Sequence, residues 1–197
     1  ASAEYNGGQI VPVVTVKNGD RVLTEDVDYV LSYDMNTDAT ARAKVVVTGK
    51  GNYKDSVTRY FAITRKSIAD ADVAGITAKS FTGNPITQDM TVKVDGVILT
   101  QGTDYTVKYE NNIHAGTAAI TITGAGNYTD SVKKSFVINR VDISDTAVIT
   151  GTENEVTYKG KAFKFDNVKV TWGRLVLQEG RDYSMTYQNN SGITMTR

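Results

Sequence analysis

The chain of 197 residues has no cysteine, one histidine, one tryptophan and two prolines. Without cysteine it has neither a disulfide framework nor a thiolate nucleophile. A single histidine, His114, excludes the usual zinc ligand sets and supports no histidine-containing triad, so we expect it to be a solvated loop residue. With 22 basic and 22 acidic residues, the chain has no charge excess to attract nucleic acid or an anionic membrane.

Long apolar segments are also missing. No run approaches the roughly 20 residues that cross a bilayer, and no signal peptide or sorting tail is visible. What the chain does contain is 17 glycines, 11 tyrosines and short runs of Val, Ile, Thr and Tyr broken by Gly, Asn and Asp. This composition indicates strands and turns, and no stretch has a sustained helical period, so we predict an all-β fold.

The clearest signal is an internal repeat. GKGNYKDSVTRYFAIT at residues 49–64 returns as GAGNYTDSVKKSFVIN at residues 124–139. Other landmarks recur three times, 76–78 residues apart: an aromatic residue two before a glycine (Tyr5, Phe81, Tyr158), an Asp-Tyr pair (Asp28 and Tyr29, Asp104 and Tyr105, Asp182 and Tyr183) and an asparagine after it (Asn36, Asn112, Asn190). Repeats at a fixed period predict tandem modules, with boundaries at 1–64, 65–139 and 140–197.

The second copy is the complete one and predicts about seven short strands. A hairpin turns at the dipeptide Asp95 and Gly96, which supplies the positive φ angles of such a turn. Apolar residues alternate with polar ones along the strands, as when one sheet face is buried. We therefore predict small Ig-like antiparallel β-sandwich modules, with a β-grasp arrangement as the alternative. With strands of about eight residues, three modules joined by short linkers should extend over about 80–100 Å.

The two outer copies differ from the second. The first lacks the lead-in strand, and the third stops before the equivalents of TAAITIT and SFVI. Three explanations are open: an expression boundary, a chain visible only to this point, or a strand borrowed from a neighbouring chain. We favour the first two, and we expect the parent protein to be longer.

The repeated pattern is aromatic-x-Gly, hairpin, Asp-Tyr, Tyr-x-x-Asn, Gly-x-Gly-Asn-Tyr and Phe-x-Ile. It resembles the MBG-type and bacterial Ig-like repeats of bacterial cell-surface proteins over essentially the whole chain. The first copy departs from it at MNTDATARA, and the third lacks Gly-x-Gly-Asn-Tyr. The resemblance implies an extracellular, tandem spacer and implies no catalytic residues.

The repeated polar positions are interpreted as architecture. We expect Asp28, Asp104 and Asp182 to accept backbone N–H bonds at strand entries, with the tyrosines that follow them packed on the core. The two Gly-x-Gly-Asn-Tyr stretches precede strands, not helices, which excludes a phosphate loop. Their glycines and asparagines, Asn52 and Asn127 among them, are expected to form turns with left-handed backbone.

Three further candidate sites are each confined to one copy. Asp34, Asn36 and Asp38 resemble the start of a calcium loop, but lack its later glycine and glutamate, so a hydrated loop is favoured. Trp172 is either a sugar-stacking platform or a core-packing residue, with packing favoured because Val94 has the same place in the second copy. A covalent link from Lys93 or Lys133 to Asn112 is possible in such modules, but solvated lysines are favoured.

These observations predict a non-catalytic stalk that holds another domain away from a bacterial surface, without cofactor, nucleic-acid ligand or membrane insertion. Its partners would be neighbouring repeats. The alternative is an adhesin module that binds a glycan or matrix protein near Trp172. An enzyme lacks support because nucleophile, base and metal signals are all missing.

Overall fold

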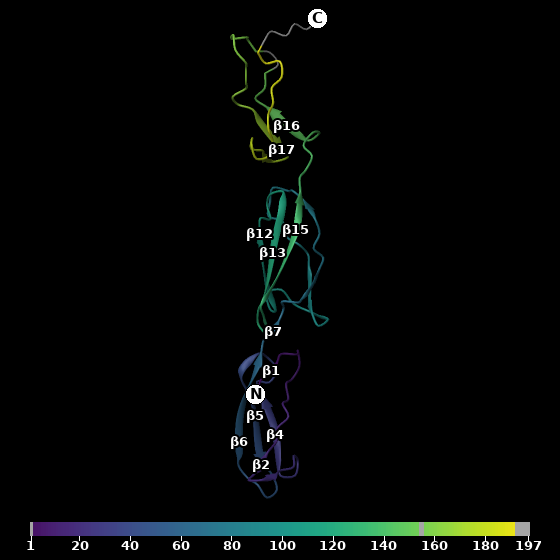
Figure 1. The fold of residues 1–197 in the computed structure, drawn as a ribbon, viewed down its shortest axis with the longest axis vertical. Helices are drawn as coiled ribbons and strands as arrows, with labels where there is room; N and C mark the ends of the chain where they lie inside the picture. Colours follow the sequence, from purple (N-terminus) through teal and green to yellow (C-terminus); the bar gives the residue numbers. More distant parts are fainter. Residues whose placement is uncertain (1, 154–155, 192–197) are drawn as a thin grey trace.

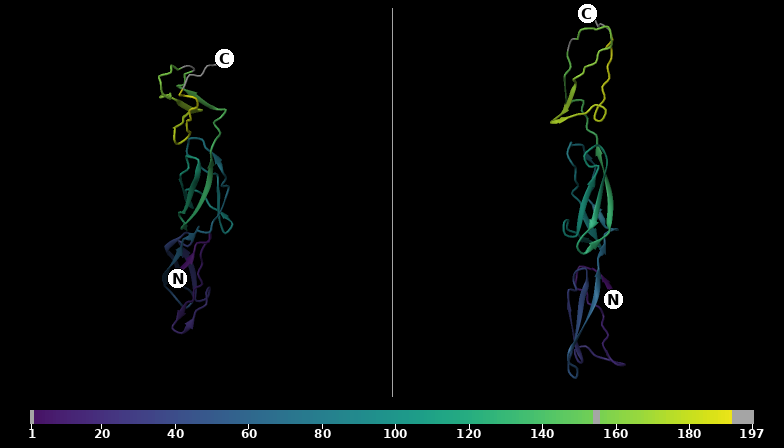
Figure 2. Two further views of the ribbon diagram at one scale, coloured as in Figure 1. Left: turned by 45° about the horizontal axis from the view of Figure 1, so that its top comes forward. Right: turned by 90° about the vertical axis from the view of Figure 1, so that its left-hand side faces the viewer.

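The computed structural model describes residues 2–153 and 156–191, and all regular structure in these residues is β-strand. The strands form three groups that follow one another along the long axis of the molecule (Figures 1 and 2). We call them the first group (residues 2–64), the second group (66–139) and the third group (140–191). The all-β prediction is confirmed, and the described residues contain no helix that could cross a membrane.

The first group contains one four-stranded sheet and one hairpin. The sheet has the order β1-β6-β5-β4, and the hairpin pairs β2 with β3. The strands are β1 (Ser2–Glu4), β2 (Lys17–Asn18), β3 (Arg21–Val22), β4 (Tyr29–Asp34), β5 (Thr40–Gly49) and β6 (Ser56–Thr64).

The second group contains two larger sheets. One has the order β12-β13-β15-β9, the other has the order β11-β10-β8, and β14 pairs with β7 next to the first group. The strands are β7 (Lys66–Ser67), β8 (Asp72–Ala74), β9 (Lys79–Ser80), β10 (Thr91–Val94), β11 (Val97–Ile98), β12 (Tyr105–Glu110), β13 (Gly116–Gly124), β14 (Tyr128–Thr129) and β15 (Ser131–Asn139).

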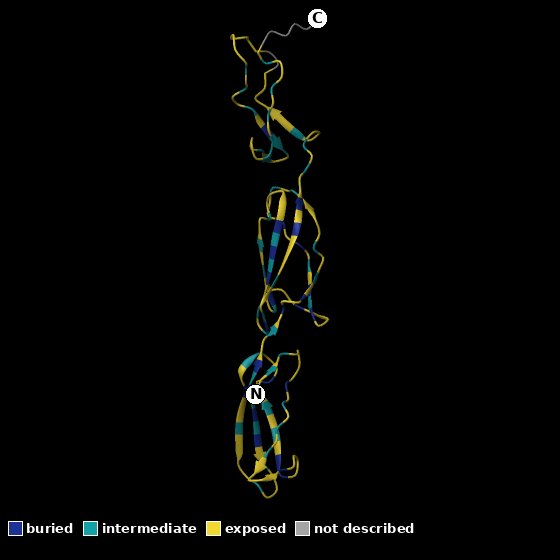
Figure 3. Cartoon of the chain, viewed as in Figure 1, coloured by how far each residue is buried: buried dark blue, intermediate teal, exposed yellow. Residues whose placement is uncertain are grey.

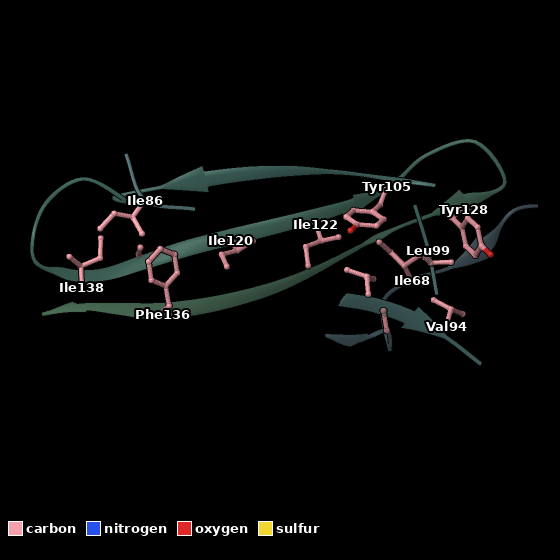
Figure 4. Packing of buried hydrophobic residues seen from close by; sticks show 13 residues of the cluster. Ile68, Ile86, Val94, Leu99, Tyr105, Ile120, Ile122, Tyr128, Phe136 and Ile138 are labelled. Carbon is pink, nitrogen blue, oxygen red and sulfur yellow. The ribbon is translucent and has the colours of Figure 1, made fainter. Parts of the chain in front are cut away.

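The core of the second group lies between its two sheets. Along β13, Ala118, Ile120 and Ile122 are completely buried and alternate with less buried residues, because successive side chains of a strand point to opposite faces. They pack with Phe136 of β15 and Val92 of β10 in one hydrophobic cluster (Figure 4). The buried faces therefore hold two sheets around one core, which agrees with the β-sandwich class.

Not all strand pairs are antiparallel, and that part of the prediction is wrong. β1 runs parallel to β6, β9 parallel to β15, and β7 parallel to β14. In the first two pairs, one partner is the earliest and the other the latest strand of that sheet along the chain, so the partners are far apart in sequence. A hairpin imposes antiparallel pairing only on strands that follow one another, so the direction of these distant pairs is free of that constraint.

The outer groups have fewer strands than the second. The third group has one sheet among its described residues, β16 (Ala147–Thr150), β17 (Lys169–Trp172) and β18 (Leu175–Val176), and this sheet corresponds to β8, β10 and β11. Val170 is its one buried hydrophobic residue in the described part, and the group is largely exposed in Figure 3. In the first group, the hairpin of β2 and β3 has no counterpart of β8 beside it.

The predicted hairpin turn between β10 and β11 is confirmed. Asp95 and Gly96 have φ angles of 49° and 81°, and Val94 pairs with Val97 across the turn. Two successive positive φ angles give the backbone the twist that antiparallel strands require.

Candidate functional site

The repeated aspartates have one structural role in all three groups. The carboxylates of Asp28, Asp104 and Asp182 each accept a hydrogen bond, at 2.8–2.9 Å, from the backbone N–H four residues earlier. Each residue precedes a tyrosine at the entry to a strand or bridge. Such bonds satisfy a backbone donor in a turn, and they leave one oxygen of each carboxylate for other contacts.

The repeated asparagines and tyrosines serve the same kind of purpose. The side-chain amides of Asn36, Asn112 and Asn190 donate to backbone carbonyls 26 or 27 residues earlier, at 2.7–3.0 Å. Tyr29 and Tyr105 are buried, and Tyr183 is half-buried. The asparagines therefore hydrogen-bond one loop to another within each group, and the tyrosines pack into the interior of their group.

The Gly-x-Gly-Asn-Tyr turn depends on its two glycines for different reasons. At Gly124 a Cβ atom would lie 2.7 Å from the backbone nitrogen of Thr129, so the chain leaves no space for a side chain. Gly126 has a φ angle of 58°, which favours glycine. The expected left-handed backbone at Asn127 and Asn52 is wrong, since neither has a positive φ, and the structure gives the Asn127 side chain another role.

That role lies at the first junction, where the second group meets the first. The Asn127 amide oxygen accepts the N–H of Ala39 at 2.8 Å, and its Nδ2 donates to Asp38 Oδ1 at 2.9 Å. Beside it, the rings of Tyr5 and Tyr128 meet edge to face with centroids 5.6 Å apart. Two hydrogen bonds with opposite directions, together with an aromatic contact, define the orientation of one group on the other.

A lysine adds a charged contact at the same junction. Lys66 Nζ lies 2.6 Å from Asp95 Oδ2 and 3.8 Å from Glu4 Oε2, so one cation faces a carboxylate of each group. The hydrogen bond to Asp95 raises the pKa of Lys66. Both carboxylates are largely exposed, so this contact contributes less than the buried ones.

Trp172 lies at the second junction, between the second and third groups. Its ring is half-buried, with its centroid 6.2 Å from that of Phe81. Phe81 in turn stacks on His114 at 6.4 Å, so the exposed histidine is in contact with an aromatic ring and is not simply a solvated loop residue. Trp172 lies at the end of β17, as Val94 lies at the end of β10 in the second copy. The aromatic partner of Trp172, Phe81, belongs to the neighbouring group.

These aromatic residues line a pocket of about 470 Å³. Arg181 and Asp182 line its third-group side, joined by a hydrogen bond of 2.7 Å. The Arg181 guanidinium and the N–H of Gln178 lower the pKa of Asp182 to about 2, so the carboxylate is charged at neutral pH. The pocket therefore offers aromatic faces, an imidazole and an ion pair.

The structure does not bring the calcium-loop candidates together. Asp34 forms an ion pair with Lys44 at 2.8 Å. Asn36 is buried and donates a hydrogen bond to the Ile10 carbonyl, and Asp38 accepts a hydrogen bond from Asn127. Three side chains with three separate partners do not form one coordination sphere. Among the described residues no three His, Asp or Glu side chains form a metal-binding cluster.

The lysines considered for a covalent link have ordinary surroundings. Lys133 is exposed and Lys93 is half-buried, and both lie on strands. Asn112 uses its amide on the Ile86 carbonyl at 2.9 Å. A link to Asn112 would require that bond to be given up.

No family model, curated protein or solved structure matches this chain. The contacts that Tyr5, Asn127 and Tyr128 make across the junction were not predicted from the sequence. Their partners lie 88 or more residues away in another copy, whereas a repeat pattern compares equivalent positions and does not identify contacts between copies. The one available signal was that the Asn-Tyr pair recurs after Gly-x-Gly in both copies of the turn.

Proposed function

We propose that this chain is a non-catalytic stalk or spacer segment of a bacterial surface or secreted protein, built from tandem Ig-like β-sandwich modules of the MBG-type kind. Its task is positional: it separates a binding or catalytic domain from the surface that anchors it. A stalk needs length, resistance to bending and few reactive groups.

One observation carries this proposal. The three groups lie end to end (Figure 1), and the first junction is closed by side-chain contacts, not only by the linker. Fixed inter-module contacts keep an array extended, whereas modules joined by a linker alone move relative to one another. The neutral net charge agrees with a segment that does not attract nucleic acid or an anionic surface by charge.

Small-angle X-ray scattering of the full chain tests this proposal. We expect the scattering profile of a single elongated particle whose largest dimension reaches about 80–100 Å and is unchanged between low and moderate salt. A compact particle, or a broad ensemble of bent shapes, would contradict the stalk.

The alternative function is an adhesin module, and the pocket beside Trp172 is the observation that favours it. An aromatic face next to a carboxylate and a guanidinium suits the stacking and hydrogen bonding that sugars require. A panel of glycans and matrix proteins, with Trp172→Ala as the matched variant, tests it. Saturable binding that this variant abolishes would replace the stalk with an adhesin.

A further inference from the structure

The second junction repeats the first at the level of single residues. Phe81, His114 and Ala115 of the second group each lie 76 positions after Tyr5, Asp38 and Ala39 of the first group. The backbone agrees with this correspondence, because the N–H of Phe81 donates to the Asn139 carbonyl just as the N–H of Tyr5 donates to the Thr64 carbonyl.

At the first junction this surface is filled by a turn of the next group. Asn127 bonds to Asp38 and Ala39, and Tyr128 packs edge to face on Tyr5. Tyr128 is buried there, with an exposed fraction of 6%.

A backbone edge beside this surface is also filled. β14 pairs with β7, and the N–H groups of Lys66 and Ile68 donate to the carbonyls of Asn127 and Thr129 at 2.9 and 3.0 Å. Val141 and Ile143 stand 75 positions after Lys66 and Ile68. Within the described ranges, the amides of these two residues donate to no backbone carbonyl.

The pocket at the second junction lies on these counterparts. Its lining includes Phe81, His114, Ala115, Val141 and Ile143, and its volume of about 470 Å³ is in the range of ordinary ligand sites, roughly 300–1,000 Å³. We propose that this pocket is a preformed seat for a Gly-x-Gly-Asn-Tyr turn carried by a strand pair of the β13 and β15 kind.

The chemistry of the pocket suits this occupant. The Ala115 N–H would donate to the asparagine oxygen, and a His114 ring nitrogen would accept from its amide in place of Asp38 Oδ1. The Phe81 ring would pack edge to face with the ring of the tyrosine, as Tyr5 packs with Tyr128 at the first junction. The open backbone amides of Val141 and Ile143 would gain carbonyl partners from the residues around the tyrosine, as in β-strand addition.

The proposal is independent of the stalk function. It concerns which segment binds in the pocket at the second junction, and not the task of the whole chain. It also gives Trp172 a specific place. Trp172 and Leu177 line the third-group side of the pocket, and the Trp172 ring contacts Phe81 at its edge, with centroids 6.2 Å apart.

The full chain extended after Arg197 tests the seat. In the repeat alignment Arg197 corresponds to Ala119, so the extension is a second copy of residues 120–139, which brings its own Gly-Ala-Gly-Asn-Tyr turn. A matched control carries the same extension with the appended asparagine and tyrosine both changed to alanine. We expect hydrogen exchange at the amides of Ala115, Val141 and Ile143 to slow by about tenfold or more in the extended chain and not in the control.

Cross-linking provides the second measurement. Because the chain has no cysteine of its own, only the introduced cysteines can react. The pair Asp38→Cys with Asn127→Cys in the original chain is the positive control. The pair His114→Cys with the appended asparagine changed to cysteine should close with the same short thiol cross-linker to a similar yield. A positive control that closes while the second pair does not would overturn the proposal.

Two further results would also overturn it. Equal protection of the three amides by the extension and by its alanine control would mean that the turn makes no specific contact. Protection of the same amides by a glycan, with none by the extension, would make the pocket a ligand site of the adhesin kind.

Discussion

At the scale of single residues, one backbone position is filled differently in the three copies. Asp26, Gly102 and Gly180 stand at the same place before the repeated Asp-Tyr pair, and all three have left-handed backbone, with φ angles of 65°, 87° and 83°. A side chain at such an angle crowds the following carbonyl, and glycine does not. The first copy is therefore strained where the other two are relaxed.

Asp26→Gly should for this reason stabilise the first group by about 0.5–1 kcal/mol, after the larger entropy of glycine in the unfolded chain is subtracted. Hydrogen exchange of the β4 and β5 amides measures the gain. Glu25→Gly is the control, since Glu25 has no positive φ and should lose stability. A loss in both variants would show that the Asp26 side chain outweighs its backbone strain.

A second residue-scale prediction concerns pH. The folded pKa of Asp182 is lowered from 3.8 to about 2, chiefly by Arg181. A depressed carboxyl pKa stabilises the folded state above the unfolded pKa, and this stabilisation disappears as the pH falls from about 4 to about 2. The fluorescence of Trp172, the single tryptophan, should report a falling thermal midpoint for the third group over this range.

Two variants separate this effect from general acid unfolding. Asp182→Asn should be less stable at pH 7 and should lose the part of the pH dependence that belongs to this carboxyl. Arg181→Gln should move the remaining transition to higher pH, because the first cause of the shift is gone. Unchanged midpoints between pH 4 and 2 in the original chain would refute the prediction.

At the scale of elements, the Gly-x-Gly-Asn-Tyr turn links β13 to β14 at a close backbone approach. A Cβ atom at Gly124 would meet backbone nitrogen and oxygen of Thr129 at 2.7 and 2.8 Å, and Gly49 has the same problem with Lys54. Gly124→Ala should therefore cost about 1–3 kcal/mol of the free energy of unfolding, in the range of overpacked sites.

Chemical denaturation of Gly124→Ala and Gly49→Ala measures that cost, and both variants should lose a similar amount. Gly8→Ala is the matched control. The nearest atom to a Cβ there is 3.6 Å away and the φ angle is not positive, so the change should stay within about 0.5 kcal/mol. Equal effects at all three sites would mean that backbone proximity is not the reason for these glycines.

The elements also show what sequence reasoning can reach. The alternation along β13 and β15 predicted their buried faces, and Asp95 with Gly96 predicted a hairpin, because both features are local. The parallel pairing of β9 with β15 was not predictable, since it joins strands about 60 residues apart with no turn to set their direction. Asn127 lies in the predicted turn, but its contacts with Asp38 and Ala39 were not predictable, because these partners lie in another copy.

At the scale of the whole molecule, stiffness should depend on a few side chains at the first junction. Asn127→Ala removes both of its hydrogen bonds to the first group, and Tyr128→Ala removes the ring that meets Tyr5. Each variant removes part of the side-chain contacts that join the two groups beyond the linker, so the groups should gain freedom to bend.

Spin labels on β5 and β13 measure this directly, because a distance distribution between them widens when the junction bends. Asn127→Ala should broaden the distribution, with the double variant broader still, while thermal stability within each group changes little. Asn52→Ala is the matched control: Asn52 has the same place in the first Gly-x-Gly-Asn-Tyr turn, but it is exposed. The turn between β5 and β6 that contains it lies at the end of the first group far from this junction (Figure 1). A narrow distribution in Asn127→Ala, or equal broadening in Asn52→Ala, would locate the stiffness in the linker itself, and the junction contacts would then not be what keeps the array straight.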